Sequence, residues 1–371
     1  MSRNRIIYQS LGVFASQTTG TNGARIMQTG AGNVKQLTRV QSFDSDFTRN
    51  LTDINQFGNL AFIDRLDAEA PTVTANVSYY VTDGLNERLL GLTVSTGTQA
   101  GVSCIKDILQ KNTDEKNIYL LVTSEGSDAS SFAGAVSGVV GIGNTFITSY
   151  TLDVAVGDIP TATVALEALN TKIYGSVTGI TNDVPAVNPE NGLSITGQYF
   201  RLPQHTTNAY GAQPTALLPG DATLDISGVI GFDTNDLKVQ SASMSFDLAR
   251  TPINKLGSRF SFAREIDFPV TATLSVETEI GDLADGSVSD LLCQTGTYDL
   301  TLRLKKINCS GQGDTAMSAT LKGAKLVSQS LATTIGGNAT LSADFEVPIG
   351  GPEDTVRGIF LSGSYPLAAL S

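Results

Sequence analysis

The sequence predicts a mainly β protein: two tandem copies of one antiparallel β-sandwich or barrel domain, each with about one short helix and extended loops. Three observations support this prediction. Several segments alternate apolar and polar residues with a period of two, as strands with one buried face do. One stretch of the chain recurs in its second half. Glycine is abundant, at 37 of 371 residues, and tryptophan is absent, which favours strands and tight turns over long helices.

The recurring stretch covers Arg39–Asp83 and, without gaps, Lys238–Asp282. About 13 of the 45 aligned positions are identical, where chance would give roughly three. A second block aligns Ser149–Glu167 with Ser328–Glu346 in the same order, at an offset of 179 residues instead of 199. The first copy must therefore hold about 20 more residues between the blocks, and we assign them to a mobile loop at Ser124–Gly143, which is rich in Gly, Ser and Ala.

These blocks divide the chain into a first β domain at residues 1–174, a connector at 175–224 and a second β domain at 225–371. The connector is rich in Pro, Asn and Gly, a composition that interrupts regular structure. A connector of this length usually has a function or extends over a neighbour. Residues 1–33 have a similar composition, so we expect an arm ahead of each core.

The clearest strand is Thr72–Val81, which the second copy repeats as Thr271–Glu277. Both are followed by a segment in which a short helix is plausible, at Gly101–Lys111 and at Ser287–Cys293. Arg49–Asn59 and its counterpart Leu248–Ser258 are expected to form a long hairpin tip or an insertion. The other predicted strands are Asn117–Thr123, Phe146–Val154 and Thr161–Leu169 in the first copy, and Tyr298–Ile307, Leu326–Thr334 and Ala339–Val347 in the second.

The sequence contains no pattern typical of a catalytic, cofactor-binding or metal-binding site. The single histidine, His205, has no nucleophile motif nearby, and it cannot supply a histidine-based metal site alone. The three cysteines, Cys104, Cys293 and Cys309, lack the spacing of a zinc or redox motif, so buried free thiols are expected. The glycines near Gly141 lack the lysine of a phosphate-binding loop and indicate a flexible loop instead. The clustered carboxylates are expected at solvated turns.

The charge distribution argues against a protein that grips nucleic acid. The net charge is −12, both halves are acidic, and no run of Lys or Arg stands out. No apolar stretch is long enough to span a membrane, and no apolar secretion signal follows Met1. We therefore expect synthesis in the cytoplasm and no membrane insertion by this chain.

Two features that occur in both copies of the repeat are candidates for contacts between subunits. Each copy keeps an arginine at the same place, Arg65 and Arg264, and the planar guanidinium suits ion pairs at interfaces. Each copy also keeps a turn-like Asn-x-x-Gly segment. These segments either hold the fold as turns or protrude to contact the next subunit. The candidate positions in them are Asn55, Phe57, Gly58, Asn254, Leu256 and Gly257.

Four segments of the first copy, roughly the first quarter of the chain, form a pattern that the second copy repeats weakly: Arg39–Ser42, Thr52–Gly58, Pro71–Thr74 and Ser78–Gly84. In this pattern the chain bears a resemblance to the tail-tube (major tail) proteins of long-tailed bacteriophages. This resemblance implies a β-sandwich subunit that closes into rings, which stack into a hollow conduit for DNA. Tubes of this family usually have sixfold rings of single-domain subunits. The duplication here resembles the fused variants, in which three chains supply six domains.

The resemblance implies a virion protein of the tail, self-assembled as homotrimeric rings. The tape-measure protein and genomic DNA would lie in the lumen, and tail terminator and distal tail proteins would bind the tube ends. An acidic lumen wall would repel DNA and let it slide. Two other readings remain: another assembly component, such as a capsid decoration, baseplate-hub or injection-machine tube protein, or a carbohydrate-binding or carbohydrate-hydrolysing β protein.

Overall fold

The computed structural model describes most of the chain, and the statements below concern those residues. They are residues 6–8, 11–16, 34–67, 69–96, 101–110, 115–123, 125, 136–174, 183–187, 194–201, 216–226, 238–257, 261, 263–279, 296–306, 313–333, 335, 337–350 and 351–365.

The protein is mainly β, and nearly all of its strand pairs are antiparallel, which confirms the predicted class. The strands of the first half are β1 (Leu11–Ser16), β2 (Val34–Gln36), β3 (Val40–Thr48), β4 (Leu51–Ile54), β5 (Asp64–Asp67), β6 (Thr72–Tyr80), β7 (Val94–Thr96), β8 (Lys116–Thr123), β9 (Val136–Ala155), β10 (Thr161–Ala168) and β11 (Asn170–Tyr174). Those that follow are β12 (Asp183–Val187), β13 (Ser194–Arg201), β14 (Ala222–Asp225), β15 (Lys238–Asp247), β16 (Arg250–Ile253), β17 (Ala263–Ile266), β18 (Thr271–Glu279), β19 (Tyr298–Lys305), β20 (Thr315–Ala332), β21 (Thr340–Pro348) and β22 (Gly358–Gly363).

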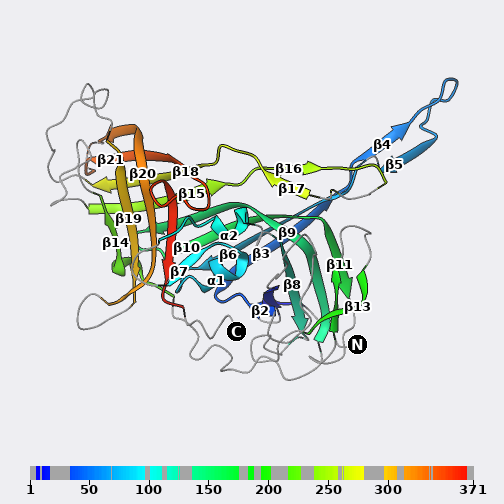
Figure 1. Ribbon diagram of the computed structural model, residues 1–371, viewed down its shortest axis with the longest axis horizontal. Helices are drawn as coiled ribbons and strands as arrows, with labels where there is room; N and C mark the ends of the chain where they lie inside the picture. Colours follow the sequence, from blue (N-terminus) through cyan, green and yellow to red (C-terminus); the bar gives the residue numbers. More distant parts are fainter. Residues whose placement is uncertain are drawn as a thin grey trace.

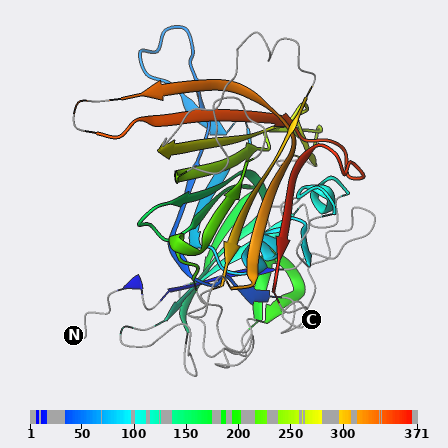
Figure 2. The same cartoon turned by 90° about the vertical axis from the view of Figure 1, so that its left-hand side faces the viewer.

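A central sheet runs through both halves of the chain in the order β20-β21-β18-β15-β9-β10-β6-β3. Its strands lie side by side in Figure 2, from the orange β20 and β21 to the green and blue strands of the first half. The long strands β9 and β20 continue from this sheet into two side sheets. The first side sheet has the order β2-β1-β8-β9-β11, and the second has the order β14-β19-β20-β22-β7.

The two halves have the same strand pairing residue by residue. Within the central sheet, β20-β21-β18-β15 repeats the order of β9-β10-β6-β3. The ladder between β3 and β6 slips between Val40 and Ser42, and the ladder between β15 and β18 slips at the counterparts Val239 and Ser241. A second matching slip follows Ala165 in β10 and Asp344 in β21. The sequence repeat therefore corresponds to a structural repeat, bulges included.

One continuous apolar core joins the sheets. The inward-facing side chains of β6, Val73, Ala75, Val77 and Tyr79, are buried, as the alternating pattern predicted. One carboxyl lies in this core: Glu87 accepts hydrogen bonds from the hydroxyls of Tyr79 (3.0 Å) and Tyr150 (3.4 Å). Burial raises the pKa of Glu87 to about 7, since desolvation disfavours its charged form.

The helices differ in part from the prediction. Helix α2 (Lys106–Leu109) falls within the predicted segment Gly101–Lys111. Helix α1 (Leu85–Leu90) was not predicted, although it begins after Gly84 and ends before Gly91, both in the left-handed conformation. The helix expected at Ser287–Cys293 lies outside the described residues.

The expected mobile loop Ser124–Gly143 is wrong at its C-terminal end, where residues from Val136 onward are part of β9. This part of β9 pairs with β8 and β11, and its glycines make room for a close neighbour: a Cβ at Gly141 would lie 3.4 Å from the Tyr119 ring. The connector at 175–224 is also more regular than its composition suggested. It contains the antiparallel pair of β12 and β13, and its last residues begin β14, which pairs with β19 at the edge of the second side sheet.

Candidate assembly interface

The two copies are joined by a hydrogen-bonded strand pair inside the chain, which we call the internal junction. Here β15 of the second copy pairs antiparallel with β9 of the first, with Phe246 opposite Tyr150 and Ser243 opposite Asp153. The rings of Phe246 and Tyr150 stack at 5.6 Å, and the Ser243 hydroxyl donates to Asp153 Oδ1 at 2.6 Å. The copies are thus joined head to tail. The first core strand of the second copy, β15, pairs with the third core strand of the first copy, β9, so one sheet runs through both copies.

The same two kinds of edge are left open at the ends of the central sheet. Within the described part of the chain, β3 pairs only with β6, and residues 325–332 of β20 pair only with β21. Phe47 on β3 is 58% exposed, whereas its counterpart Phe246 is 2% exposed at the internal junction. Leu331 on β20 is likewise 58% exposed, whereas its counterpart Leu152 is fully buried. Both open edges thus expose apolar side chains at positions that the internal junction covers.

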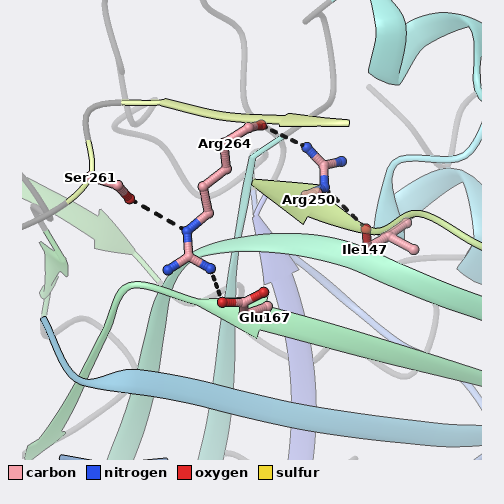
Figure 3. Close-up of polar contacts among 5 residues, drawn as sticks. All are labelled: Ile147, Glu167, Arg250, Ser261 and Arg264. Atoms are coloured by element: carbon pink, nitrogen blue, oxygen red, sulfur yellow. Dashed lines mark hydrogen bonds and ion pairs between the residues drawn. The ribbon is translucent and has the colours of Figure 1, made fainter. Parts of the chain in front are cut away.

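A hairpin arm of the second copy, β16–β17, rests on the first copy (Figures 1 and 3). Arg264 forms an ion pair with Glu167 of β10, and its Nε lies 3.5 Å from the Ser261 hydroxyl. Arg250 donates from Nε to the Ile147 carbonyl at 3.3 Å and from a terminal nitrogen to the Arg264 carbonyl at 3.2 Å. Its guanidinium also lies over the Phe146 ring, 4.9 Å from the centroid. This arm therefore contributes a second set of contacts between the copies.

The corresponding arm of the first copy, β4–β5, projects away from the body of the molecule (Figure 1). Its Arg65 pairs with Asp53 of the same arm and lies 4.9 Å from the centre of the Phe62 ring. The Arg65 side chain is 48% exposed, in contrast to 7% for Arg264. The equivalent arginines therefore have different partners: one within its own arm and one on the neighbouring copy.

The Asn-x-x-Gly segments form the turns at the tips of the two arms. Asn55, Phe57 and Gly58 lie at the first tip, and Asn254, Leu256 and Gly257 at the second. Gly58 and Gly257 have φ values of 91° and 82°, a conformation that favours glycine. Phe57 and Leu256 are fully exposed. Each arm thus carries four of the predicted residues: three at its tip and one arginine.

The outward face of the central sheet is a polar surface that the sequence reading did not identify. On this face, cross-strand neighbours are mostly Ser, Thr and acidic residues. Asp344 accepts hydrogen bonds from Ser328 (2.5 Å) and Ser275 (2.7 Å), which lower its pKa. On the described strands, basic residues on this face lie only at strand ends, at Lys238 and Lys325. The exposed acids of this face are Asp44, Asp46, Asp153, Asp247, Glu277, Asp344 and Glu346.

Comparisons with known proteins give limited similarity. No protein-family model matches the chain, and no curated protein matches it in sequence. Among solved structures, a chain of the SPP1 tail tube is similar over 47% of this chain and 81% of its own length, with 13% identity and a TM-score of 0.28. A chain of the anti-feeding prophage baseplate is similar over 38% of this chain and 91% of its own, with 12% identity and a TM-score of 0.26.

The described residues contain no group of three His, Cys, Asp or Glu side chains placed to hold a metal ion. In the same part of the chain, no helix is both long and apolar enough to cross a membrane. Cys104 is a buried free thiol, whereas His205, Cys293 and Cys309 lie outside the described residues. What the described geometry offers is therefore a set of repeated edges, arms and faces.

Proposed function

We propose that this chain is a structural subunit of a phage tail, which assembles as three-chain, pseudo-sixfold rings that stack into a hollow tube for DNA. The internal junction is the observation that carries the proposal. It joins two equivalent domains head to tail, and the chain leaves an open edge of each type for a further, equivalent junction. A heterologous contact of this kind closes a ring or continues as a filament. The resemblance of Arg39–Gly84 to tail-tube proteins favours the ring.

In the proposed ring, β3 of one chain pairs with β20 of the next. Transfer of the internal register through the repeat places Phe47 opposite Gln329 and Ser45 opposite Leu331. Phe47 and Leu331 then become buried as Phe246 and Leu152 are. Full burial of one such side chain contributes about 1.5–3 kcal/mol. Fusion of two domains supplies half of the junctions within the chains, so only three must form by association.

The polar face of the central sheet would line the bore. Its opposite face is covered by the two side sheets, so a closed central sheet has this side available for the lumen, apart from the end where the arm docks on Glu167. Duplex DNA carries about one negative charge per 1.7 Å of its axis. A wall of hydroxyls and carboxylates repels the phosphates and leaves DNA, or a tape-measure protein before it, free to move. Terminator and distal tail proteins would bind the end rings.

Electron microscopy of the concentrated full-length protein tests this function. We expect hollow tubes whose end views have threefold symmetry with six similar lobes. Isolated rings that never stack would favour a baseplate-hub or another assembly role. A protein that remains monomeric at all concentrations would contradict assembly, and turnover or binding of glycans by that monomer would favour the carbohydrate-related alternative.

A further inference from the structure

We infer that the β4–β5 arm of one chain docks on the second copy of a neighbouring chain, where Arg65 exchanges Asp53 for Glu346. The inference rests on the proposed ring and names a contact within it. Its partner is a second copy of this chain, because β4–β5 and β20–β21 lie at opposite ends of the molecule (Figure 1). An arm therefore cannot reach the Glu346 of its own chain.

The template for this contact is the arm that is already docked. Arg264 of β17 reaches from the second copy to Glu167 on the first. The counterpart of Arg264 is Arg65, and the counterpart of Glu167 is Glu346, by the same offsets that align the strand ladders. Both members of the ion pair are therefore present twice in the sequence, but the pair forms only once within a chain.

A hollow lies at the site that the undocked arm would occupy. It has a volume of about 420 Å³, and its lining includes Lys325, Val327, Glu346 and Pro348. On the first copy the equivalent positions include Phe146 and Leu169, which are buried, and Phe146 lies under Arg250 of the docked arm. The same surface is thus covered on the copy that has received an arm and hollow on the copy that has not.

The free arm carries surface that matches such a site. Leu51, the counterpart of Arg250, is 40% exposed. Further large apolar side chains of the arm are exposed as well, and contiguous exposed apolar surface marks interaction sites. They are Ile54, Leu60, Phe62, Ile63 and Leu66. A docked arm would cover part of this surface while its charged residues pair across the contact.

Asp53 explains how Arg65 is paired before docking. The two oxygens of Asp53 accept hydrogen bonds from Arg65, the second at 3.1 Å. The position opposite Arg264 in the docked arm is Pro252, which offers no such acceptor. The copy whose arm docks within the chain thus has no carboxylate opposite its arginine, whereas the copy whose arm is undocked has Asp53 there. On docking, Arg65 would leave the carboxylate of Asp53 and pair with that of Glu346.

A disulfide experiment tests the contact directly. Full-length Arg65→Cys and Glu346→Cys chains are mixed at equal concentration under assembly conditions and oxidised mildly. We expect a covalent heterodimer that needs both chains. Arg65→Cys mixed with Glu167→Cys is the matched control, because Arg264 of the same chain already occupies that site, and no heterodimer should form. Crosslinking to position 167 in preference to 346 would overturn the inference.

Charge reversal provides a functional readout that does not depend on cysteines. Arg65→Glu and Glu346→Arg should each raise the concentration for half-maximal ring assembly at least tenfold, and the two substitutions together should restore most of the loss. If rings form but neither crosslinking nor rescue is seen, the arm contact is wrong, whereas the proposed tube function is not contradicted. If the unmodified chain forms no rings by microscopy, the proposed function and the arm contact fail together.

Discussion

Phe246 and Tyr150 stack across the internal junction, and the repeat makes Phe47 the counterpart of Phe246. Phe47 faces the same side of its strand as Phe246 does but has no strand beyond it among the described residues. One phenylalanine position is therefore part of a core in one copy and part of an open edge in the other. Substitutions at Phe47 and at Phe246 can therefore separate an effect on assembly from an effect on folding.

Replacement of Phe47 with Asp should prevent ring formation without a large change in the stability of the single chain. Phe47 is more than half exposed in the isolated chain, but an uncompensated carboxylate at a buried junction is unfavourable. Light scattering reports the assembly, and thermal unfolding of the monomer reports the stability. The matched variant Phe246→Ala should lower the free energy of unfolding by about 3–5 kcal/mol. Normal rings from Phe47→Asp chains would contradict the proposed edge.

The register of the proposed junction is testable with cysteine pairs. A chain with Ser45→Cys and Leu331→Cys should form disulfides between chains on oxidation, with covalent products that end at the trimer. The residues are expected to lie opposite each other, and opposed positions in antiparallel strands have Cβ atoms about 4.5–5.5 Å apart. The pair Ser45→Cys and Ser330→Cys is the control, because neighbouring residues of a strand point to opposite faces. Equal crosslinking of both pairs would contradict the register.

The charge of the polar face should control how tubes treat DNA. Substitution of Asp44, Asp153 and Asp344 with Lys changes the charge by six per chain on the wall that we assign to the bore. We expect slower genome delivery, and DNA retention by variant tubes that weakens steeply with added salt, as phosphate contacts do. Ejection kinetics and DNA retention at two salt concentrations measure this. Unchanged ejection and infectivity would refute an acidic bore.

The arm tips should affect stacking more than ring closure. Leu256 remains fully exposed although its arm is docked, so docking leaves the tip uncovered. Phe57→Ser combined with Leu256→Ser should therefore reduce tube length and increase the number of free rings. Electron microscopy measures both. Tubes of normal length would show that the tips take no part in stacking.

The buried Glu87 predicts a pH dependence of folding. Its ordinary pKa of 4.5 rises to about 7 in the folded chain, so the native state holds this proton more tightly than the unfolded state. The resulting stability is fully present below about pH 4.5 and is lost as the pH rises towards 7, in total about 3 kcal/mol. Denaturant unfolding at pH 5 and pH 8 should show the loss, and Glu87→Gln should remove it. The same slope in both proteins would contradict the assignment to Glu87.

Period-two alternation was enough to predict the main strands, because each has one buried face. Thr72–Tyr80 and Thr161–Ala168 begin where the sequence placed them and end within a residue of the prediction. The repeat also predicted equivalent pairing, since β3 pairs with β6 in the same register as β15 pairs with β18. The domain boundaries at 174 and 224 remain a prediction.

The features that sequence failed to predict have specific physical causes. Gly-rich residues 136–143 resemble a loop in composition, but in β9 they accept strand neighbours on both sides, a tertiary effect that composition does not carry. The arginine pair was recognised by its repeat, whereas its different partners, Asp53 and Glu167, depend on which copy has a neighbour. The polar face is visible in the sequence, because Ser, Thr and Asp occupy alternate positions along β3. The sequence alone does not show whether such a face is an outer surface or lines a bore.

Ser243 and Asp153 form a bond that the second kind of junction cannot reproduce, since the counterpart positions are Asp44 and Ala332. A ring of three such molecules would then have two unequal types of seam in alternation. Mechanical or chemical stress would open it at the three seams between molecules first. Disassembly should accordingly release intact pairs of domains, because the seam inside each molecule has a hydrogen bond that the seam between molecules would lack.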